Sequence, residues 1–534
     1  MSSSIGVAGS RHSVSATDRT HRMPRLRILL LITGVCLALL IVIAVLCVKY
    51  WPFSESAVRQ DLAEASDSEV TIRSYHGSYF PPGCTLEGVE FRHGHDHFKL
   101  IVIDKLVVEG SYPGLLSRHV PRITAIGARV FIPPLGSNVQ FHSKHSTTAV
   151  DELVANGTGV EFISADRQQG SVVFDVHEAR LRNVRWGSPM EYRLEFHNPD
   201  PPGEISVEGK FGAWTDGHPQ DTPMSGTYTF DHADLGVYGG IAGILSSKGK
   251  FDGVLKHINV SGTTETPDFV VKSGGHKHAL STIFDAYVDA TRGDTFLNQV
   301  EAHIGRTTLL GRGKVAGTKG EKGKTADLHF TSRNGRIEDI LGLFVSAPKS
   351  PMSGDLKFVA DAQLPSGDQL FLQRVKLQAR FGIDDGSFKP ETQKDVNALS
   401  AGARGQNKDD PEGVVSDLEG RLGLTDGVAH FSDLHFGVPG AQAWMHGIFN
   451  VVDYRIDLHG NMKVDTSISN TSSGVKALLL KVMDPFFRKL NKKKGEIVPV
   501  HILGTYQKPQ FGLDFSSNDD KSNDKKDKKD DTKK

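Results

Sequence analysis

Alternating histidines are the residues of this sequence with the clearest potential for chemistry. His93, His95 and His97 alternate in the segment RHGHDHF. On a strand the three imidazoles would share one face, where they could bind zinc or copper. Gly94 and Asp96, which lie between them, are instead typical of a hairpin tip, and no cysteine or second histidine cluster lies nearby in the sequence. We therefore expect no metal site here.

Catalytic motifs give no sign of an enzyme. The sequence contains no G-x-S-x-G, no P-loop, no G-x-G-x-x-G after a strand and no H-E-x-x-H. The acidic pairs Asp384-Asp385 and Asp409-Asp410 lie in turn-like sequence, where carboxylates normally face water. A glycosidase would need two carboxylates that face each other across a cleft, which spacing alone does not indicate. We predict that the protein is not an enzyme and uses no cofactor.

The composition is that of a large folded protein. Of its 534 residues, 38% are hydrophobic and 23% are charged, which suits a folded chain rather than a disordered one. The formal net charge of -1 gives no electrostatic reason to expect nucleic acid as a partner. The 56 glycines are typical of many tight turns between short strands.

One early segment is suited to a membrane. Residues 28–48 form a run of about 21 residues without a charge, which as a helix would span roughly 31 Å, the thickness of a bilayer's hydrocarbon core. Tyr50 and Trp51 follow as an interfacial belt, which favours an anchor over a cleaved signal peptide. Arginines precede the run and acidic residues follow it, which favours a cytoplasmic N-terminus. We predict a transmembrane helix at residues 27–49, with the bulk of the chain outside the cytoplasm.

The clearest strand pattern lies in two neighbouring segments. Every second residue from Leu356 to Leu364 is apolar, and Lys357, Asp361 and Gln363 lie between them. After a turn around Pro365, the same alternation runs from Val375 to Ile383. Two strands that each have one polar and one apolar face predict an antiparallel hairpin in a sheet covered on one side only. The apolar face must meet another sheet, a helix or a lipid.

Two pairs of segments resemble each other within the chain. GKFDGVLKHINVSG at 249–262 resembles GIFNVVDYRIDLHG at 447–460, with glycines at both ends. Gly262-Thr263 leads to a proline and a phenylalanine at the same spacing as Gly504-Thr505. We interpret both Gly-Thr segments in the same way: a strand ends, Gly-Thr forms a turn, and the proline opens the next strand. Such recurrence is typical of a repetitive β architecture, although chance similarity between glycine-bounded strands is an alternative.

Five segments have helical character. Residues 56–65 and 112–118 predict two short helices, and the apolar spacing predicts amphipathic helices at 280–288, 337–344 and 475–487. The helix at 475–487 is basic and contains Pro485, which bends or breaks it. It could lie on a membrane or cap a lipid-filled groove, or it could pack on the sheet with solvated lysines. The final residues, 516–534, lack apolar side chains and predict a disordered charged tail.

The sequence divides into six expected regions. They are a cytoplasmic segment (1–26), the transmembrane helix (27–49), an N-terminal β region (50–165), a central β region (166–330), a C-terminal β region (331–515) and the disordered tail (516–534).

Short motifs at both ends of the chain resemble the AsmA-like family of bacterial envelope proteins, which is related to TamB and YhdP. The motifs of the N-terminal part are the membrane helix and the segments 77–83, 86–89 and 110–116. Those of the C-terminal part are 335–341, 416–420, 426–427, 438–441, 484–487 and 504–511. The stretch from about 133 to 226 matches only loosely.

The resemblance implies a mainly β fold in which an N-terminal transmembrane helix precedes an elongated, curved antiparallel sheet with an open, taco-like groove and a few amphipathic helices. It also implies a place in the bacterial inner membrane, crossed once, with the bulk of the chain in the periplasm. The implied activity is binding of phospholipid in an apolar groove and assistance in lipid transport to, or assembly of, the outer membrane. Phospholipid, the inner membrane and envelope proteins of the outer membrane or periplasm are the expected partners.

The candidate groove residues are those on the apolar sides of two strand-like segments. They are Val375, Leu377, Phe381 and Ile383 in the first segment, and Ile448, Val452, Tyr454, Ile456 and Leu458 in the second. The pattern is the same for a lipid-lining face and for a closed core. A non-catalytic envelope scaffold or outer-membrane protein assembly factor is therefore the alternative, and an enzyme acting on glycan or lipid is a third possibility.

Overall fold

The computed structural model describes residues 51–513 with several gaps. Within that range it leaves out 94–97, 134–147, 164–170, 214–220, 239, 273–274, 291–292, 318–322, 346–348, 368, 370, 405–412, 465–496 and 506–507. The predicted transmembrane helix, the helix at 475–487 and the charged tail therefore lie outside the described residues. In the part of the chain that is described, no helix has both the length and the apolar character needed to cross a membrane.

The chain separates into two units, Met1–Val58 and Arg59–Lys534. In the described part of the first unit, Trp51 and Phe53 meet edge to face, with ring centroids 6.1 Å apart. All the strands belong to the second unit.

The second unit is mainly β, as predicted, and the strands of its described residues form one open 24-stranded sheet. The strands are β1 (Glu69–Ser78), β2 (Gly83–His93), β3 (Phe98–Glu109), β4 (His119–Ile132), β5 (Ala149–Phe162), β6 (Val172–Val184), β7 (Met190–Pro199), β8 (Pro202–Phe211), β9 (Pro223–Asp234), β10 (Ile241–Ala242), β11 (Ile244–Val254), β12 (His257–Val271), β13 (His278–Asp289), β14 (Asp294–Ile304), β15 (Thr307–Gly317), β16 (Lys324–Arg336), β17 (Met352–Leu364), β18 (Lys376–Phe388), β19 (Ser416–Thr425), β20 (Val428–Val438), β21 (Ala441–Asn450), β22 (Arg455–Val464), β23 (Ile497–Thr505) and β24 (Lys508–Leu513).

Among the described residues the helices are few and short. They are α2 (Glu55–Ser66), α3 (Tyr112–Ser117), the 3₁₀ turn η2 (Leu235–Tyr238), α4 (Ile337–Phe344), α5 (Phe371–Arg374) and α6 (Pro390–Arg404). The predicted helices at 56–65, 112–118 and 337–344 are confirmed as α2, α3 and α4. Helix α6 has no counterpart among the sequence predictions.

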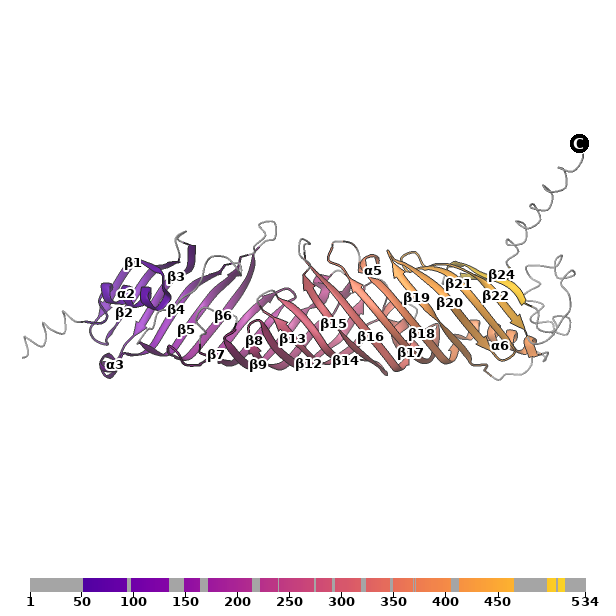
Figure 1. The fold of residues 1–534 in the computed structure, drawn as a ribbon, viewed down its shortest axis with the longest axis horizontal. Coiled ribbons are helices and arrows are strands. Elements are labelled where there is room, and N and C mark those ends of the chain that lie inside the picture. Colours follow the sequence, from indigo (N-terminus) through magenta and orange to yellow (C-terminus); the bar gives the residue numbers. More distant parts are fainter. Residues whose placement is uncertain are drawn as a thin grey trace, which may run out of the picture. The chain divides into compact units, whose positions relative to one another are not determined.

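The strands pair in chain order, as Figure 1 shows from indigo β1 to yellow β24. Strand β11 lies between β9 and β12, and the two-residue strand β10 also pairs with β12. Every pair is antiparallel except β4–β5, which is parallel. Pairing between neighbours in the chain keeps connections short, so each strand is positioned by the strands just before and after it.

The predicted hairpin forms as β17 and β18. Its register sets Leu356 opposite Ile383, Phe358 opposite Phe381 and Ala362 opposite Leu377. Directly opposite residues share one face of a sheet. The intervening polar residues of both strands are mostly exposed, so the alternation of the sequence is the alternation of the two faces.

Three sequence predictions require correction. Residues 280–288 form the strand β13 rather than a helix. The segment 447–460 is a hairpin, because β21 ends at Asn450 and β22 begins at Arg455. The segment 249–262 is likewise a hairpin of β11 and β12.

The repeated pattern of Gly-Thr followed by a proline has different structures at its two sites. Gly504 and Thr505 end β23 and pair with Pro509 and Lys508 of β24, whereas residues 506–507 between the two strands lie outside the described residues. Residues 262–269 instead stay within β12, where the register shifts between Thr266 and Phe269.

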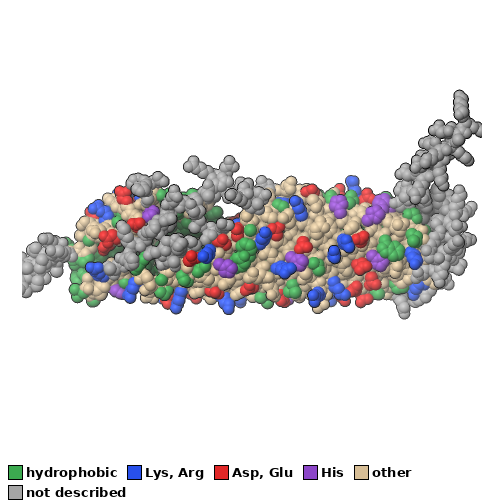
Figure 2. Space-filling view, in the orientation of Figure 1, with side chains coloured by type: hydrophobic (Ala, Val, Ile, Leu, Met, Phe, Trp, Pro, Cys, Tyr) green, Lys and Arg blue, Asp and Glu red, His purple; other side chains and the backbone are tan. Residues whose placement is uncertain are grey.

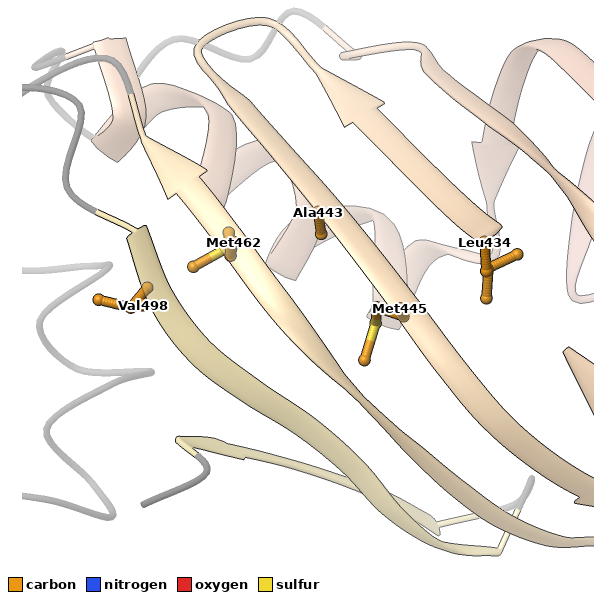
Figure 3. Close-up of a cluster of buried hydrophobic side chains, with 5 residues drawn as sticks. All are labelled: Leu434, Ala443, Met445, Met462 and Val498. Carbon is orange, nitrogen blue, oxygen red and sulfur yellow. The ribbon is translucent and has the colours of Figure 1, made fainter. Parts of the chain in front are cut away.

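Buried apolar clusters form where helices pack on the sheet. One cluster unites Leu434, Ala443, Met445, Met462 and Val498 from four neighbouring strands (Figure 3). Leu399 of α6 packs against this cluster, and Val396 and Ala403 of α6 join a second cluster with the ends of β20–β22. Helix α4 packs through Ile337, Ile340 and Leu341 against a third cluster, formed by Met352, Leu356 and Ile383.

A half-buried apolar face as the candidate binding site

The described part of the sheet has one continuous face of almost entirely uncharged residues, which we call the apolar face. It follows from the register, since residues opposite one another in successive strands point to the same side. One row of it runs Phe196, Ile205, Phe230, Ser247, Thr264, Thr282, Ala302 and Leu309 through β7–β9 and β11–β15. Across the strand pairings from β6 to β19, the rows of this face contain no Asp, Glu or Arg, and their single Lys is Lys324, which lies opposite Gly317 at the end of β15 and the start of β16.

Burial of the apolar face differs along the sheet. Strands β1–β5 contain fourteen buried apolar side chains among their described residues, whereas the longer stretch β6–β15 contains six. In β8, Ile205 and Val207 are half-buried, while the alternate residues Ser206 and Glu208 are exposed. The middle of the sheet therefore presents apolar side chains that are neither packed in a core nor fully in water.

Aromatic rings of the apolar face lie over glycines on the neighbouring strand. Tyr228 is opposite Gly249, and Phe251 is opposite Gly226. A Cβ atom added to either glycine would lie 2.9 Å from the facing ring. Glycine is required at these positions because the ring occupies the space of the missing side chain, an arrangement that supports curved sheets.

Three phenylalanines form a ladder across β5–β7. The ring centroids of Phe162 and Phe174 are 5.5 Å apart, and those of Phe174 and Phe196 are 5.9 Å apart, both edge to face. Phe162 is 42% exposed, so the ladder begins at an accessible apolar surface. Edge-to-face packing fixes the rings while leaving their outer edges available to an apolar ligand.

The electrostatic environment of this face disfavours charge. Burial raises the pKa of Tyr192 to about 12, because the phenolate would be poorly solvated there. Burial also raises the pKa of Tyr228, although a hydrogen bond with Ser247 opposes that effect. Both phenols are therefore neutral at neutral pH.

The opposite face carries the charge. Arg122 donates a 3.0 Å hydrogen bond to Glu152, which lowers the pKa of that carboxyl. A surface cavity of about 230 Å³ is lined by Glu178, Arg180, Arg193 and Glu195, and Arg180 pairs with Glu178 at 2.7 Å. Figure 2 shows acidic and basic side chains interspersed over the surface in view.

The structure brings most of the predicted groove residues of the first segment onto the apolar face. Leu377 and Phe381 are half-buried there, and Ile383 is 3% exposed in the cluster that α4 covers. Val375 lies just before β18 and donates its N–H to the carbonyl of Phe371 at 2.9 Å.

The second segment divides between the two faces. Ile456 and Leu458 lie on the apolar face, opposite Phe449 and Gly447. Ile448 is opposite Asp457 and belongs to the charged face. Val452, which is 47% exposed, and Tyr454 lie in the turn between β21 and β22.

Turn chemistry is the signal that identifies this hairpin. The side-chain oxygen of Asn450 accepts hydrogen bonds from the backbone N–H groups of Val452 and Asp453, at 2.9 and 3.2 Å. Asp453 in turn accepts from the N–H of Arg455. An Asn followed three residues later by an Asp is typical of a turn, and it breaks the alternation of the segment.

The histidines and acidic pairs that were considered for chemistry lie apart from one another where they are described. His93 ends β2, with its Nδ1 2.7 Å from the carbonyl oxygen of Asp67, and His95 and His97 lie outside the described residues. Asp384 pairs with Lys357 at 2.6 Å. Within the described ranges, no three His, Cys, Asp or Glu side chains form a group that could hold a metal ion.

Comparisons with known proteins give no neighbour: no family model, no curated protein and no solved structure matches the chain.

Proposed function

We propose that this chain is an AsmA-like envelope protein that binds phospholipid on the apolar face and assists lipid transport to, or assembly of, the outer membrane. The observation that supports the proposal most is the uncharged, half-buried middle of that face. Monomeric proteins rarely leave more than a few hundred Å² of contiguous apolar surface open without a ligand or partner.

Energetics favour an acyl chain as the occupant. Removing a chain of about 15 methylene groups from water contributes about 12 kcal/mol at roughly 0.8 kcal/mol per group. That gain vanishes when the lipid comes from a bilayer, where the chain is already dry. Exchange between membrane and protein is then close to neutral, which suits a carrier that must also release its lipid.

The proposed groove requires a concave apolar face. Register shifts that mark β-bulges recur along the ladder, for example at Ser332/Gly335, Ser353/Asp355 and Phe431/Leu434. Bulges and glycines bend strands, and they support a curved sheet with the aromatic rings on its inner side. A membrane helix at 27–49 would hold such a groove at the inner membrane, with a periplasmic location for the sheet. The chain would act as a shuttle or as part of a longer conduit.

The test is native mass spectrometry of the purified full chain with lipid extraction. We expect co-purified phospholipid, and we expect Val207→Asp to remove most of it because a carboxylate on the apolar face repels hydrocarbon. Ser206→Asp, on the adjacent exposed position of β8, is the matched control and should retain the lipid. A folded chain that carries no phospholipid would overturn the proposal.

The alternative is a scaffold or assembly factor without a lipid ligand. The observation that favours it is the closure of the C-terminal part of the apolar face, where α4 and α6 pack into buried clusters. If helices and loops cover the whole apolar face and exclude lipid, the same mass spectra should show no bound lipid. Val207→Asp should then leave the spectra unchanged.

A further inference from the structure

A short row of hydroxyl groups interrupts the apolar face near the middle of the sheet. Ser247 of β11, Thr264 of β12 and Thr282 of β13 lie opposite one another in register. Tyr228 of β9 joins them, since its Oη lies 3.1 Å from Oγ of Ser247. All four side chains are half-buried. We call these four residues the hydroxyl row.

In the hydroxyl row, one O–H group remains without a hydrogen-bond acceptor in the described part of the chain. Each hydroxyl has a single O–H to donate. Ser247 donates to the carbonyl oxygen of Thr263 at 3.1 Å, so Tyr228 is the donor in its contact with Ser247. Thr264 and Thr282 share one hydrogen bond of 2.7 Å. One O–H of this threonine pair therefore has no acceptor among the described residues.

The residues around the hydroxyl row indicate which kind of hydrogen-bond acceptor fits the remaining O–H group. Phe230 and Ala302 continue the row on either side, and Gly249, Gly262 and Phe284 lie one position further along the strands. No Lys or Arg in these rows could balance a phosphate, which is normally bound through charged donors. A neutral carbonyl oxygen, flanked by hydrocarbon, fits both the spare donor and the apolar surface.

We propose that the hydroxyl row is the subsite for an ester carbonyl of a diacyl lipid. The inference rests on the proposed function, because it presumes that lipid lies on the apolar face. One threonine O–H donates to the ester oxygen, while the acyl chains continue over the glycines and aromatic rings on either side. The lipid thereby takes a fixed position along an otherwise uniform surface, with its phosphate directed away from the row.

The experiment is a competition between two lipids on the full-length protein. Equimolar diester and diether phosphatidylethanolamine with identical chain lengths are offered in detergent micelles, and native mass spectrometry distinguishes the bound species by mass. We expect the wild-type protein to prefer the diester lipid about three- to tenfold, the effect of one hydrogen bond. Thr264→Val/Thr282→Val should bind both lipids equally. Thr263→Val, on the same strand but the opposite face, should retain the preference.

The outcomes separate this inference from the proposed function. Equal binding of diester and diether lipid by the wild-type protein would overturn the carbonyl subsite and leave lipid binding intact. A preference that survives the double substitution would also overturn it. Binding of neither lipid would overturn the proposed function itself. Unchanged melting temperatures of the variants would show that the hydroxyls act on the lipid rather than on folding.

Discussion

Gly249 and Gly262 face each other across β11 and β12 where the ring of Tyr228 crosses the apolar face. A Cβ atom on Gly249 would lie 2.3 Å from the carbonyl oxygen of Ser261 and 2.9 Å from the Tyr228 ring. The carbonyl belongs to the backbone of the ladder and cannot rotate away. We predict that Gly249→Ala destabilises β9–β12 by about 1–3 kcal/mol, the usual effect of overpacking, measured as faster amide hydrogen exchange in those strands.

Gly437 of β20 is the matched control for this prediction. A Cβ atom there would meet no atom within 4 Å. Gly437→Ala should therefore leave exchange in β20 unchanged, or slow it slightly because alanine restricts the unfolded chain. Equal exchange rates in the two variants would contradict the steric argument.

Helix α4 is held on the sheet through the carboxylate of Glu338 in its first turn. Oε1 of Glu338 accepts hydrogen bonds from Arg336 at 2.9 Å and from Arg306 at 2.6 Å, and Oε2 accepts from the N–H of Gly354 at 3.2 Å. Burial raises the pKa of Glu338, but its hydrogen bonds outweigh that effect and hold the pKa below its ordinary value. The ionised carboxylate is therefore the form that fixes α4.

The pH dependence of α4 follows from the lowered pKa of Glu338. A carboxyl whose pKa is lowered by folding stabilises the fold fully above its ordinary pKa, near 4.5, and loses this contribution as the pH falls through the lower folded value. We predict that α4 loosens in this acidic range in the wild-type protein. Glu338→Gln should loosen it already at pH 7, by about 1–3 kcal/mol, with a weaker pH dependence below 4.5. Hydrogen exchange of 337–344 at matched pH measures both effects.

Glu419→Gln provides the comparison, since Glu419 lies on β19 with a side chain 71% exposed beside His435. It should leave α4 unchanged at every pH. An identical acid response of α4 in wild-type protein and Glu338→Gln would show that another group controls the helix.

Elements with a single clear periodicity could be predicted from the sequence. The alternation in β17 and β18 specifies both strands and their shared apolar face, and Ile337, Ile340 and Leu341 mark the half-buried stripe of α4 that packs on the sheet. Helix α6 was not predicted, and it contacts the sheet through only a few apolar side chains, Val396, Leu399 and Ala403.

The error at β13 has a specific cause. Leu280 and Phe284 lie on the apolar face, but Ile283 is 57% exposed on the other face. Tyr287 also lies on that other face, where it stacks between His257 and Phe296 at centroid distances of 4.4 Å. Apolar residues on both faces of a strand reproduce the spacing of an amphipathic helix, so periodicity alone could not separate the two.

The location of the candidate site depends on tertiary packing, which the alternation pattern of the sequence does not predict. Leu377 and Ile383 share one alternating pattern, yet Ile383 is closed into a cluster while Leu377 is half-buried. Alternation assigns a residue to a face, but which helix or ligand covers that face is decided by elements distant in the sequence.

For the molecule as a whole, pairing between chain neighbours makes stability local. Contacts of β19–β24 are with one another and with adjacent elements, as are those of β1–β5. Architectures built this way open in segments rather than as one cooperative unit. Local opening would also let a lipid enter the apolar face without unfolding the rest of the sheet.

Paired substitutions in β20 and β2 test this locality. Leu434→Ala removes a buried side chain of the β20–β23 cluster, and Leu86→Ala removes one that is 0% exposed in β2. Each should cost about 2–5 kcal/mol through the cavity it leaves. We predict that Leu434→Ala speeds amide exchange in β19–β24 only and Leu86→Ala in β1–β4 only, as measured by hydrogen-exchange mass spectrometry. If either substitution accelerated exchange equally in both regions, the sheet would be one cooperative unit, and lipid entry would require a route other than local opening.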